Sequence, residues 1–529
     1  MRRMKGAAGL LTALLLAFQL SAQTFALANE DNGIKVVPVN FTHNGYSYEI
    51  EGVAKSTDGD YQIKSPARLA ARKLPSTYDP RSSGEITTVK DQASTGACWA
   101  FSALACAEQD LIKKGLENPS AEFSVPALVL SSNSGTATGK DDFSSGGNWL
   151  FAASALANGQ GLCYEDYEPF LESGTENMIV SENKKSVSEY RLNYVMELSS
   201  TTQVKRKIME LGAVSASYFA GNGYMNHNNT AYYDPDASKN TIINHSVTVV
   251  GWDDNYSKDN FRYKPANNGA WLVKGSWGAD QDNDGFYWVS YDEAEFGQFC
   301  CYDFEESCDN TYHYSKMTGY VVNASNDGSV YGANVFTAKA DEKLDKAGFM
   351  YVGKTGSADY IISVYTDVSD SDPIGVLETQ ISGSVSANGF YTVDFPEDIL
   401  IEEGEKYSIS VKFSGDSGRG YLLAESDRTS KAQSGQSYVS LNGKYWSDVG
   451  ADKTDSIGSL FIYAYTDDTA KPDKSSLETT LGKYGTLAGC EREANNARTV
   501  LADETASKND ISNAQKLPVS YTHLRAHET

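Results

Sequence analysis

The chain has 529 residues, of which 45 are Lys or Arg and 70 are Asp or Glu, so its formal net charge is −25. At roughly one domain per 150 residues, this length predicts about three domains. Hydrophobic residues make up 40% of the chain, which excludes wholesale disorder. The acidic balance argues against nucleic-acid binding, because phosphate contacts need clustered Lys and Arg. Seven cysteines in a chain of this length also exclude a small disulfide-built scaffold.

Along the first 28 residues, a basic stretch is followed by an apolar stretch and then by small residues. Arg2, Arg3 and Lys5 precede the apolar stretch Gly6–Leu20, and Ala26-Leu27-Ala28 supplies a small-x-small cleavage site. This order predicts a secretory signal peptide cleaved after Ala28, and therefore a secreted or cell-surface protein. An uncleaved membrane anchor is the alternative, which the shortness of the apolar run disfavours. We expect no membrane span once the signal is removed.

Residues 29–72 are polar, with a mild alternation at Tyr46, Tyr48 and Ile50. This pattern predicts a propeptide or a strand-bearing N-terminal arm.

The pattern changes again over residues 318–467, where helix signals disappear. Alternating runs separated by Gly, Asn and Asp are typical of an antiparallel β-sandwich. The clearest of these runs cover residues 360–365, 407–413 and 460–465. Tyr445-Trp446, after the turn Asn442-Gly443, offers rings that either stack on a sugar or pack within the domain.

The C-terminal part has helical spacing and an unusual end. Apolar residues in 475–518, among them Leu477, Leu481, Ala494 and Ala497, recur at the interval of a helix face. We therefore predict a truncated helical segment there. Residues 519–529 match, letter for letter, one reading frame of a sequencing adapter, so we treat them as read-through and exclude His523 and His527 from the site.

The chemistry of the chain centres on Cys98. Apolar residues after it, from Trp99 to Ile112, share one helical face, and Gly115 is a stop signal, so Cys98 opens a helix. The N–H groups and dipole at a helix N-terminus favour a thiolate over a thiol. A nucleophilic cysteine also needs a base. Gln92, six residues earlier in the same loop, has an amide that can help the Cys98 N–H to hold an oxyanion.

These motifs resemble the papain-like cysteine peptidases. The first part of the resemblance is Gln92, Gly96 and the run Cys98-Trp99-Ala100-Phe101-Ser102. Further motifs follow in the expected order: Gly146-Gly147, residues 161–170, residues 212–215, residues 244–252, and residues 271–278 with Gly285-Phe286-Tyr287. The resemblance covers about residues 73–300, and several ordered motifs make it specific.

The resemblance implies an α+β fold and assigns roles. Residues 73–308 would form a two-lobed catalytic domain, with Cys98 in a helical lobe and the catalytic base His245 in a β-barrel-like lobe. Gly146 and Gly147 would lie against the substrate backbone, and Trp277 would shield the site. The mature enzyme would begin near Leu74-Pro75. Neither a cofactor nor a metal is implied.

One position departs from the family. Gly275 stands where the family has the Asn that orients the catalytic imidazole, so we expect reduced activity by analogy with other triads. Water, Ser276 or a backbone carbonyl remains as a substitute partner. The interpretation is an exported cysteine endopeptidase acting on protein or peptide substrates. The alternative is a catalytically impaired surface adhesin or a carbohydrate- or protein-binding protein.

Two weaker resemblances concern the rest of the chain. Residues 318–467 are similar in arrangement to lectin-like modules of bacterial papain-like enzymes, which implies a cell-surface glycan or protein as a partner. Residues 475–518 resemble an incomplete helical repeat of bacterial surface proteins. Cysteine pairing stays open at this point, although Cys301 and Cys308 are near each other in sequence.

Overall fold

The fold comes from a computed structural model, which describes part of the chain. The predicted signal peptide, the adapter-like end and most of residues 29–72 lie outside that part. The described residues are 39–43, 46–51, 74–132, 143, 146–159, 162–165, 169–170, 190–221, 223–237, 243–279, 282–315, 320–323, 328–416, 420–426, 432–451, 457–469, 474–484, 491–502, 511 and 514.

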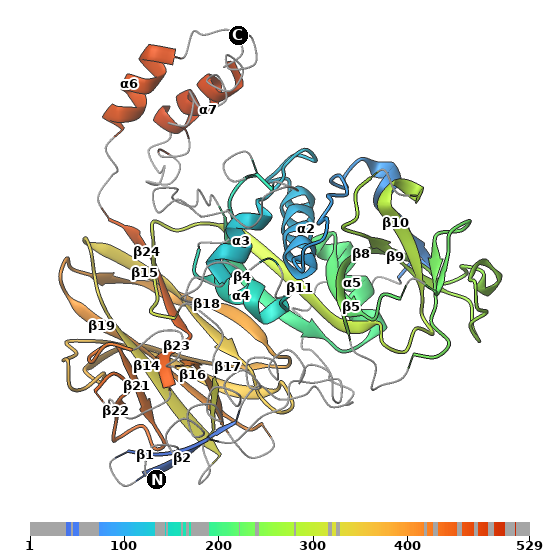
Figure 1. Cartoon of the computed structure of the whole chain (residues 1–529). Coiled ribbons are helices and arrows are strands. Elements are labelled where there is room, and N and C mark those ends of the chain that lie inside the picture. The colour runs from blue at the N-terminus through green and yellow to red at the C-terminus, as the bar shows by residue number, and fades with distance from the viewer. Residues whose placement is uncertain are drawn as a thin grey trace, which may run out of the picture.

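Three helices form one side of the first domain: α2 (Cys98–Lys114), α3 (Val125–Ser132) and α4 (Trp149–Ala157). They lie together at the top centre of Figure 1, beside the strands of the same domain. The helix α2 ends as predicted, because Gly115 has a φ of 73° and its N–H caps the last turn. The helix α4 begins at Asn148, whose side chain accepts from the N–H groups of Leu150 and Phe151.

The β part of this domain belongs to a long sheet that continues into the next domain. The first-domain strands of this sheet are β4 (Tyr190–Leu198), β11 (Gly297–Glu306), β5 (Val214–Tyr218), β8 (His245–Asp253), β9 (Ala270–Lys274), β10 (Phe286–Ser290), β7 (Ala231–Tyr232) and β6 (Met225–Asn226), with β3 (Thr77–Tyr78) paired to β8. The helix α5 (Thr201–Leu211) packs on β8 and β11. Helix α2 contacts β8 directly, and that contact positions the site.

The second domain is all β, and it is a sandwich as predicted. One layer holds β17 (Val376–Val385), β16 (Ala358–Thr366), β19 (Lys406–Ser414), β14 (Ser329–Thr337), β21 (Ser437–Ser440) and β22 (Ser447–Asp448). The facing strands include β12 (Asn310–Tyr312), β24 (Ile462–Asp468), β15 (Glu342–Tyr351), β18 (Gly389–Ile401), β20 (Tyr421–Ser426) and β23 (Ile457–Leu460). Strands β14 and β19 contact β20 and β24 across the layers, so the apolar faces bury one another.

The alternating runs in the sequence lie on these strands. Residues 360–365 are in β16 and 407–413 in β19, which pair antiparallel. The run 460–465 joins the end of β23 to the start of β24. Leu460, Ile462 and Tyr463 are all fully buried, so this run forms core rather than surface.

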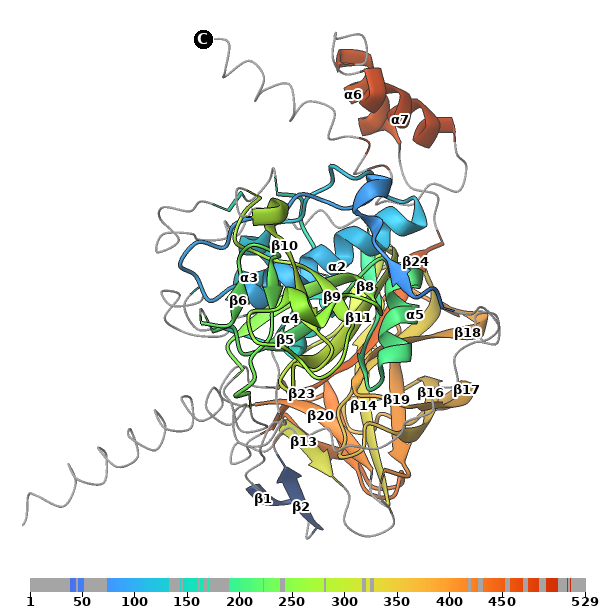
Figure 2. The same cartoon turned by 90° about the vertical axis from the view of Figure 1, so that its right-hand side faces the viewer.

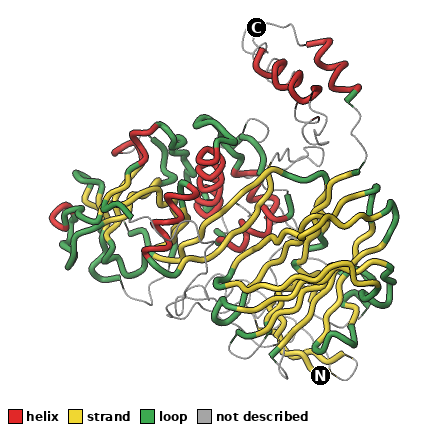
Figure 3. The backbone as a smooth tube through the Cα atoms, turned by 180° about the vertical axis from the view of Figure 1, so that it is seen from behind, coloured by secondary structure: helices red, strands yellow, loops and turns green. Residues whose placement is uncertain are grey.

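The two domains share backbone hydrogen bonds. Strand β18 of the second domain pairs antiparallel with β4 of the first, with Gly389 opposite Met196 and Tyr391 opposite Tyr194. Figure 3 shows the strands of the two domains side by side, and they form one continuous sheet. The link is therefore a strand pairing within one sheet and not only a contact between two surfaces.

The remaining described elements lie at the ends of the chain. Strands β1 (Val39–His43) and β2 (Tyr46–Glu51) form a hairpin, and β2 pairs with β13 (Tyr320–Asn323) beside the second domain (Figure 2). The alternation at residues 46–50 thus predicted a strand correctly. At the other end, α6 (Ser475–Tyr484) and α7 (Glu491–Ala502) bury Leu477, Ala494 and Ala497 against each other, which confirms the helical spacing. No helix in the described ranges is both long and apolar enough to cross a membrane.

Substituting Gly389 tests the strand pairing between the domains. A Cβ at this position would lie 2.1 Å from the Val195 carbonyl oxygen, so Gly389→Ala must push β18 away from β4. We expect the substitution to lower the free energy of unfolding by about 1–3 kcal/mol. Thermal unfolding of the full chain measures this change. Gly297→Ala is the matched control, because nothing lies within 4 Å of its Cβ, and an equal loss in both variants would contradict the interpretation.

Candidate active site

Cys98 is the first residue of α2, as the sequence predicted. Its thiol faces the Gly96 carbonyl at 4.0 Å, and the N–H and hydroxyl of Ser246, the residue directly after His245, are near enough to act on its pKa. No side chain caps this helix, since the N-cap residue is Ala97. The fold therefore brings the cysteine and the strand that begins with His245 to one place.

Hydrogen bonds between α2 and β8 hold this arrangement. The Ser102 hydroxyl donates to the Val247 carbonyl at 2.6 Å, and the Thr248 hydroxyl donates to the Ser102 carbonyl at 3.4 Å. Ser102 and Thr248 are both buried. Because these bonds lie one helical turn beyond Cys98 and a few residues beyond His245, they limit sliding of the helix along the strand.

His245 is buried and lies between aromatic rings. The Trp277 ring stacks on the imidazole, with ring centroids 5.1 Å apart and an interplanar angle of 25°. Trp277 is 43% exposed, so its ring lies between the imidazole and solvent. On the neighbouring strand, Tyr218 is directly opposite His245, with ring centroids 6.0 Å apart.

Gln92 is fixed between the loop before Cys98 and the loop that contains Ser276. Its backbone N–H donates to the Ser276 carbonyl at 2.8 Å, and its side-chain oxygen accepts from the Ser276 hydroxyl at 2.6 Å. The amide nitrogen donates to the Thr95 carbonyl at 2.8 Å. A carboxamide nitrogen carries two N–H groups, so one of them remains for a further acceptor.

At Gly275, the position of the orienting Asn in the family, a tyrosine ring fills part of the space. A Cβ on Gly275 would lie 3.3 Å from Cε1 of Tyr287 and 3.0 Å from the Gly285 carbonyl oxygen. The Tyr287 hydroxyl pairs with the Tyr218 hydroxyl at 2.9 Å. Nε2 of His245 is buried and has no hydrogen-bond partner among the described residues. Ser276, one of the expected substitutes, donates instead to Gln92.

Gly146 and Gly147 precede α4, and Gly147 lies against the indole of Trp99. Gly146 has a φ of 69°, which favours glycine. A Cβ on Gly147 would lie 2.5 Å from the indole of Trp99, the residue after Cys98. A side chain at this position is therefore excluded, and the backbone of Gly147 lies flat against the wall of the site.

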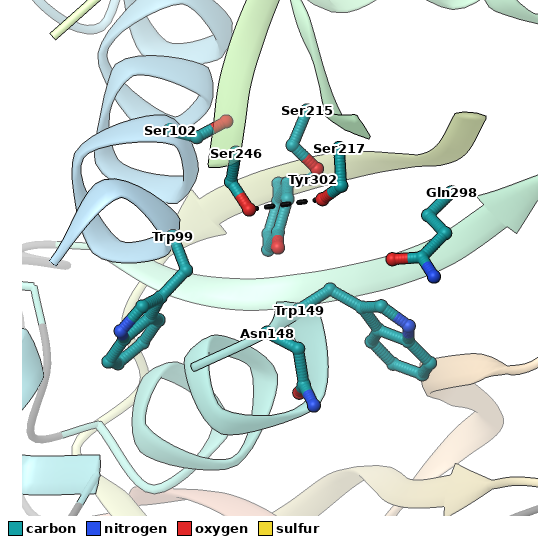
Figure 4. A pocket seen from close by; sticks show the side chains of 9 residues that line it. All are labelled: Trp99, Ser102, Asn148, Trp149, Ser215, Ser217, Ser246, Gln298 and Tyr302. Atoms are coloured by element: carbon teal, nitrogen blue, oxygen red, sulfur yellow. Dashed lines mark hydrogen bonds between the residues drawn. The ribbon is translucent and has the colours of Figure 1, made fainter. Parts of the chain in front are cut away.

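A small pocket, partly open to solvent, lies beside Trp99 and Ser246, the residues that follow Cys98 and His245. Figure 4 shows that its lining is mostly polar but carries no charge. The lining residues are Trp99, Ser102, Asn148, Trp149, Ser215, Ser217, Ser246, Gln298 and Tyr302. The Ser217 and Ser246 hydroxyls pair at 3.0 Å, and the backbone of Gln298 has a φ of 51°, which is strained for a residue other than glycine.

Sequence reasoning put forward Cys98, His245 and Gln92 as site residues, and it gave no role to Tyr218, Tyr287, Asn148, Trp149, Ser217, Gln298 or Tyr302. A pocket collects single residues from several elements, and no spacing rule connects them. Tyr287 was within a quoted motif, but only the fold shows that its ring lies against Gly275.

Two sequence profiles match this chain. Residues 74–324 match the papain family cysteine proteases, and residues 311–466 match the lectin like domain.

The chain thus contains a papain-family cysteine protease domain followed by a lectin-like domain.

The papain-like domain has relatives among the cathepsins. The chain is 24% identical to cathepsin K of Mus musculus over 216 residues, which cover 40% of this chain and 59% of the relative. It is 28% identical to procathepsin L of Felis catus over 224 residues, which cover 42% of this chain and 62% of the relative. The match thus spans about three fifths of these relatives.

Two solved structures extend over both domains. The clostridial cysteine protease Cwp84 after propeptide cleavage is 27% identical with a TM-score of 0.65, covering 75% of this chain and 100% of that one. The second structure contains the cysteine protease and lectin-like domains of Cwp84 of Clostridium difficile, described as a surface layer associated protein. It is 25% identical with a TM-score of 0.65, and the match covers 86% of this chain and 96% of that one. The predicted fold class, an α+β papain-like domain followed by an all-β domain, is therefore confirmed.

The electrostatics of the papain-like domain correct one expectation. Burial raises the pKa of the Cys98 thiol above its ordinary value of 9.0, although the N–H groups of Ser246, Trp99 and Cys98 act in the opposite direction. Burial also lowers the pKa of His245 to about 4. The helix N-terminus alone predicted a lowered thiol pKa, and this was wrong, because desolvation of the sulfur is the larger effect. No disulfide joins the six cysteines in the described part of the chain, Cys301 and Cys308 included.

These pKa shifts predict how the reactivity of Cys98 depends on pH. Burial favours the neutral form of both groups, because it lowers the pKa of His245 to about 4 and raises the pKa of the Cys98 thiol. The rate of alkylation by iodoacetamide should therefore rise through pH 9. Subtracting the rate of Cys98→Ala removes the contribution of other thiols. A plateau from pH 5 to 8 would contradict the prediction, since it indicates a preformed thiolate–imidazolium pair.

Proposed function

We propose that the protein is an exported cysteine endopeptidase that hydrolyses peptide bonds with Cys98 and His245. The observation that carries the proposal is the packing of α2, which Cys98 opens, on β8, which His245 opens. The papain-family profile and the similarity to Cwp84 support the same activity. The substrates are proteins or peptides.

In the proposed mechanism, the proton of Cys98 moves to His245 as the sulfur attacks the peptide carbonyl. Gln92 and the Cys98 N–H stabilise the oxyanion that forms. The imidazolium then protonates the leaving amine, which breaks the C–N bond and leaves a thioester. His245 next takes a proton from water, the hydroxide attacks the thioester, and the Cys98 thiol is restored as the acid product leaves. Because burial raises the pKa of the Cys98 thiol, we assign this proton transfer to the attack step.

The proposal also covers the location of the protein and its binding partners. The predicted signal peptide and the similarity to a surface layer associated protein support secretion or attachment at the cell surface. The lectin-like domain, for which we predict the bounds 318–467, supports binding of a surface glycan or protein. The net charge of −25 disfavours nucleic acid as a partner.

Covalent labelling tests the activity. The purified protein is incubated with a thiol-directed peptidyl epoxide, alongside Cys98→Ala and His245→Ala. We expect wild-type protein to be modified at Cys98, no adduct in Cys98→Ala, and a much slower reaction in His245→Ala. A folded wild-type protein that stays unmodified would instead support the impaired adhesin, the alternative raised by Gly275.

A paired substitution tests the role of Gly275. Gly275→Asn supplies an amide that can orient His245, but its Cβ would meet the Tyr287 ring at 3.3 Å. We therefore expect little gain from Gly275→Asn alone. Gly275→Asn combined with Tyr287→Val should raise kcat/KM by about tenfold or more, since an orienting partner mainly affects rate. Tyr287→Val alone is the control, and an equal gain in that variant would assign the effect to Tyr287.

The polar pocket predicts which substrate side chains react best. An apolar side chain would remove water from the hydroxyls of Ser217, Ser246 and Tyr302 without replacing its hydrogen bonds, which costs about 1–3 kcal/mol. Small uncharged polar side chains such as Ser, Thr and Asn should therefore be preferred to Leu and Phe by about tenfold or more. A positional scan of the residues before the cleaved bond measures this preference. Ser217→Ala with Ser246→Ala should reduce it, whereas the exposed Ser371→Ala should not.

A further inference from the structure

A chain of hydrogen bonds connects the pocket to the lectin-like domain, and it begins at Trp149. This residue opens α4, and its indole forms one wall of the pocket in Figure 4. The indole N–H donates to Oε1 of Glu197 at 3.1 Å. An indole has a single N–H donor, so this bond uses all of its hydrogen-bonding capacity and selects one orientation of the ring.

Glu197 connects Trp149 to Asn388 of the lectin-like domain. Oε2 of Glu197 accepts from the side-chain amide of Asn388 at 3.0 Å, and the backbone N–H of Glu197 donates to the Asn388 carbonyl at 3.0 Å. The two carboxylate oxygens therefore have different donors, one from each domain. Burial raises the pKa of the Glu197 carboxyl even though both donors act to lower it.

Asn388 is itself held firmly by its own domain. It lies immediately before β18, is 4% exposed, and its side-chain oxygen accepts from the Gly353 N–H at 2.9 Å. The next residue, Gly389, pairs with Met196 on β4. The turn before β18 is thus fixed both to the lectin-like domain and to the strand that carries Glu197.

Removing one donor from a buried carboxylate leaves an oxygen unsatisfied, and this is more costly than losing an average hydrogen bond. Loss of the Asn388 amide would therefore make Glu197 change its position or take up a proton. Either change alters the acceptor of the Trp149 indole. A change made in the lectin-like domain would in this way move a wall of the pocket beside Cys98.

We propose that Asn388 is a positioning residue for the substrate pocket: acting through Glu197 it fixes Trp149, so the lectin-like domain takes part in selecting the substrate side chain. This inference rests on the proposed peptidase function. It assigns the lectin-like domain a role in the papain-like site in addition to any ligand of its own.

The test uses three variants of the full chain. Asn388→Asp places a carboxylate against Glu197, and Glu197→Gln places two amide donors against each other, so each breaks the chain of hydrogen bonds. Combining both reverses the direction of that bond, because the new amide at position 197 can donate to the new carboxylate at position 388 while its oxygen still accepts from Trp149. We therefore expect damage in each single variant and recovery in the double variant.

The measurement is the ratio of Cys98 labelling rates for two peptidyl epoxides that differ only in one side chain, Ser or Leu. Each single variant should change this ratio by about tenfold, the equivalent of one charged-group hydrogen bond, and the double variant should restore it. An unchanged ratio in Asn388→Asp would overturn the inference, even if the variant unfolds at a lower temperature.

A matched control separates the pocket effect from general weakening of the interface. Thr392 donates from its hydroxyl to Asn193, also between β18 and β4. Asn193 lies four residues from Glu197, or about 13 Å along an extended strand. Thr392→Val should leave the ratio unchanged, and a change as large as in Asn388→Asp would overturn the inference.

A second measurement does not need a reactive cysteine. The indole N–H resonance of Trp149, assigned by its loss in Trp149→Phe, should shift in Asn388→Asp and return in the double variant. A shift in this resonance together with unlabelled wild-type protein would refute the proposed peptidase and keep the link between the domains. An unmoved resonance would refute the link itself.

Discussion

The packing of helix α2 on strand β8 is the contact on which the site depends. The helix provides Cys98 and the strand provides His245, and these residues are far apart in the sequence. Two hydrogen bonds from Ser102 and Thr248 join the buried faces of these elements. Other parts of the site are arranged around this contact: Gln92 and Trp277 approach through the loop at Ser276, and Gly147 lies on the Trp99 indole.

Much of the fold could be predicted from the sequence, because its signals are local. Helix α2 has a clear stop at Gly115, and strands such as β16 and β19 have alternating patterns. The position of the site could be predicted for a different reason. Several motifs occurred in the order that a known family requires, and such an order carries information that composition and periodicity do not.

The properties that the sequence did not predict all depend on distant contacts. A helix N-terminus favours a thiolate, but the depth at which Cys98 is buried depends on β8, and burial is the larger effect on its pKa. The Tyr287 ring lies against Gly275 only because strands β9 and β10 pair in one register. Asn388 reaches Glu197 across a domain boundary, and no local pattern marks either residue.

Because β18 pairs with β4, neither domain can be removed or exchanged without breaking a sheet. Cutting the chain between them would uncover a row of backbone N–H and C=O groups along β4, and such an open edge is a template for aggregation. Isolated production of the catalytic half should therefore favour self-association.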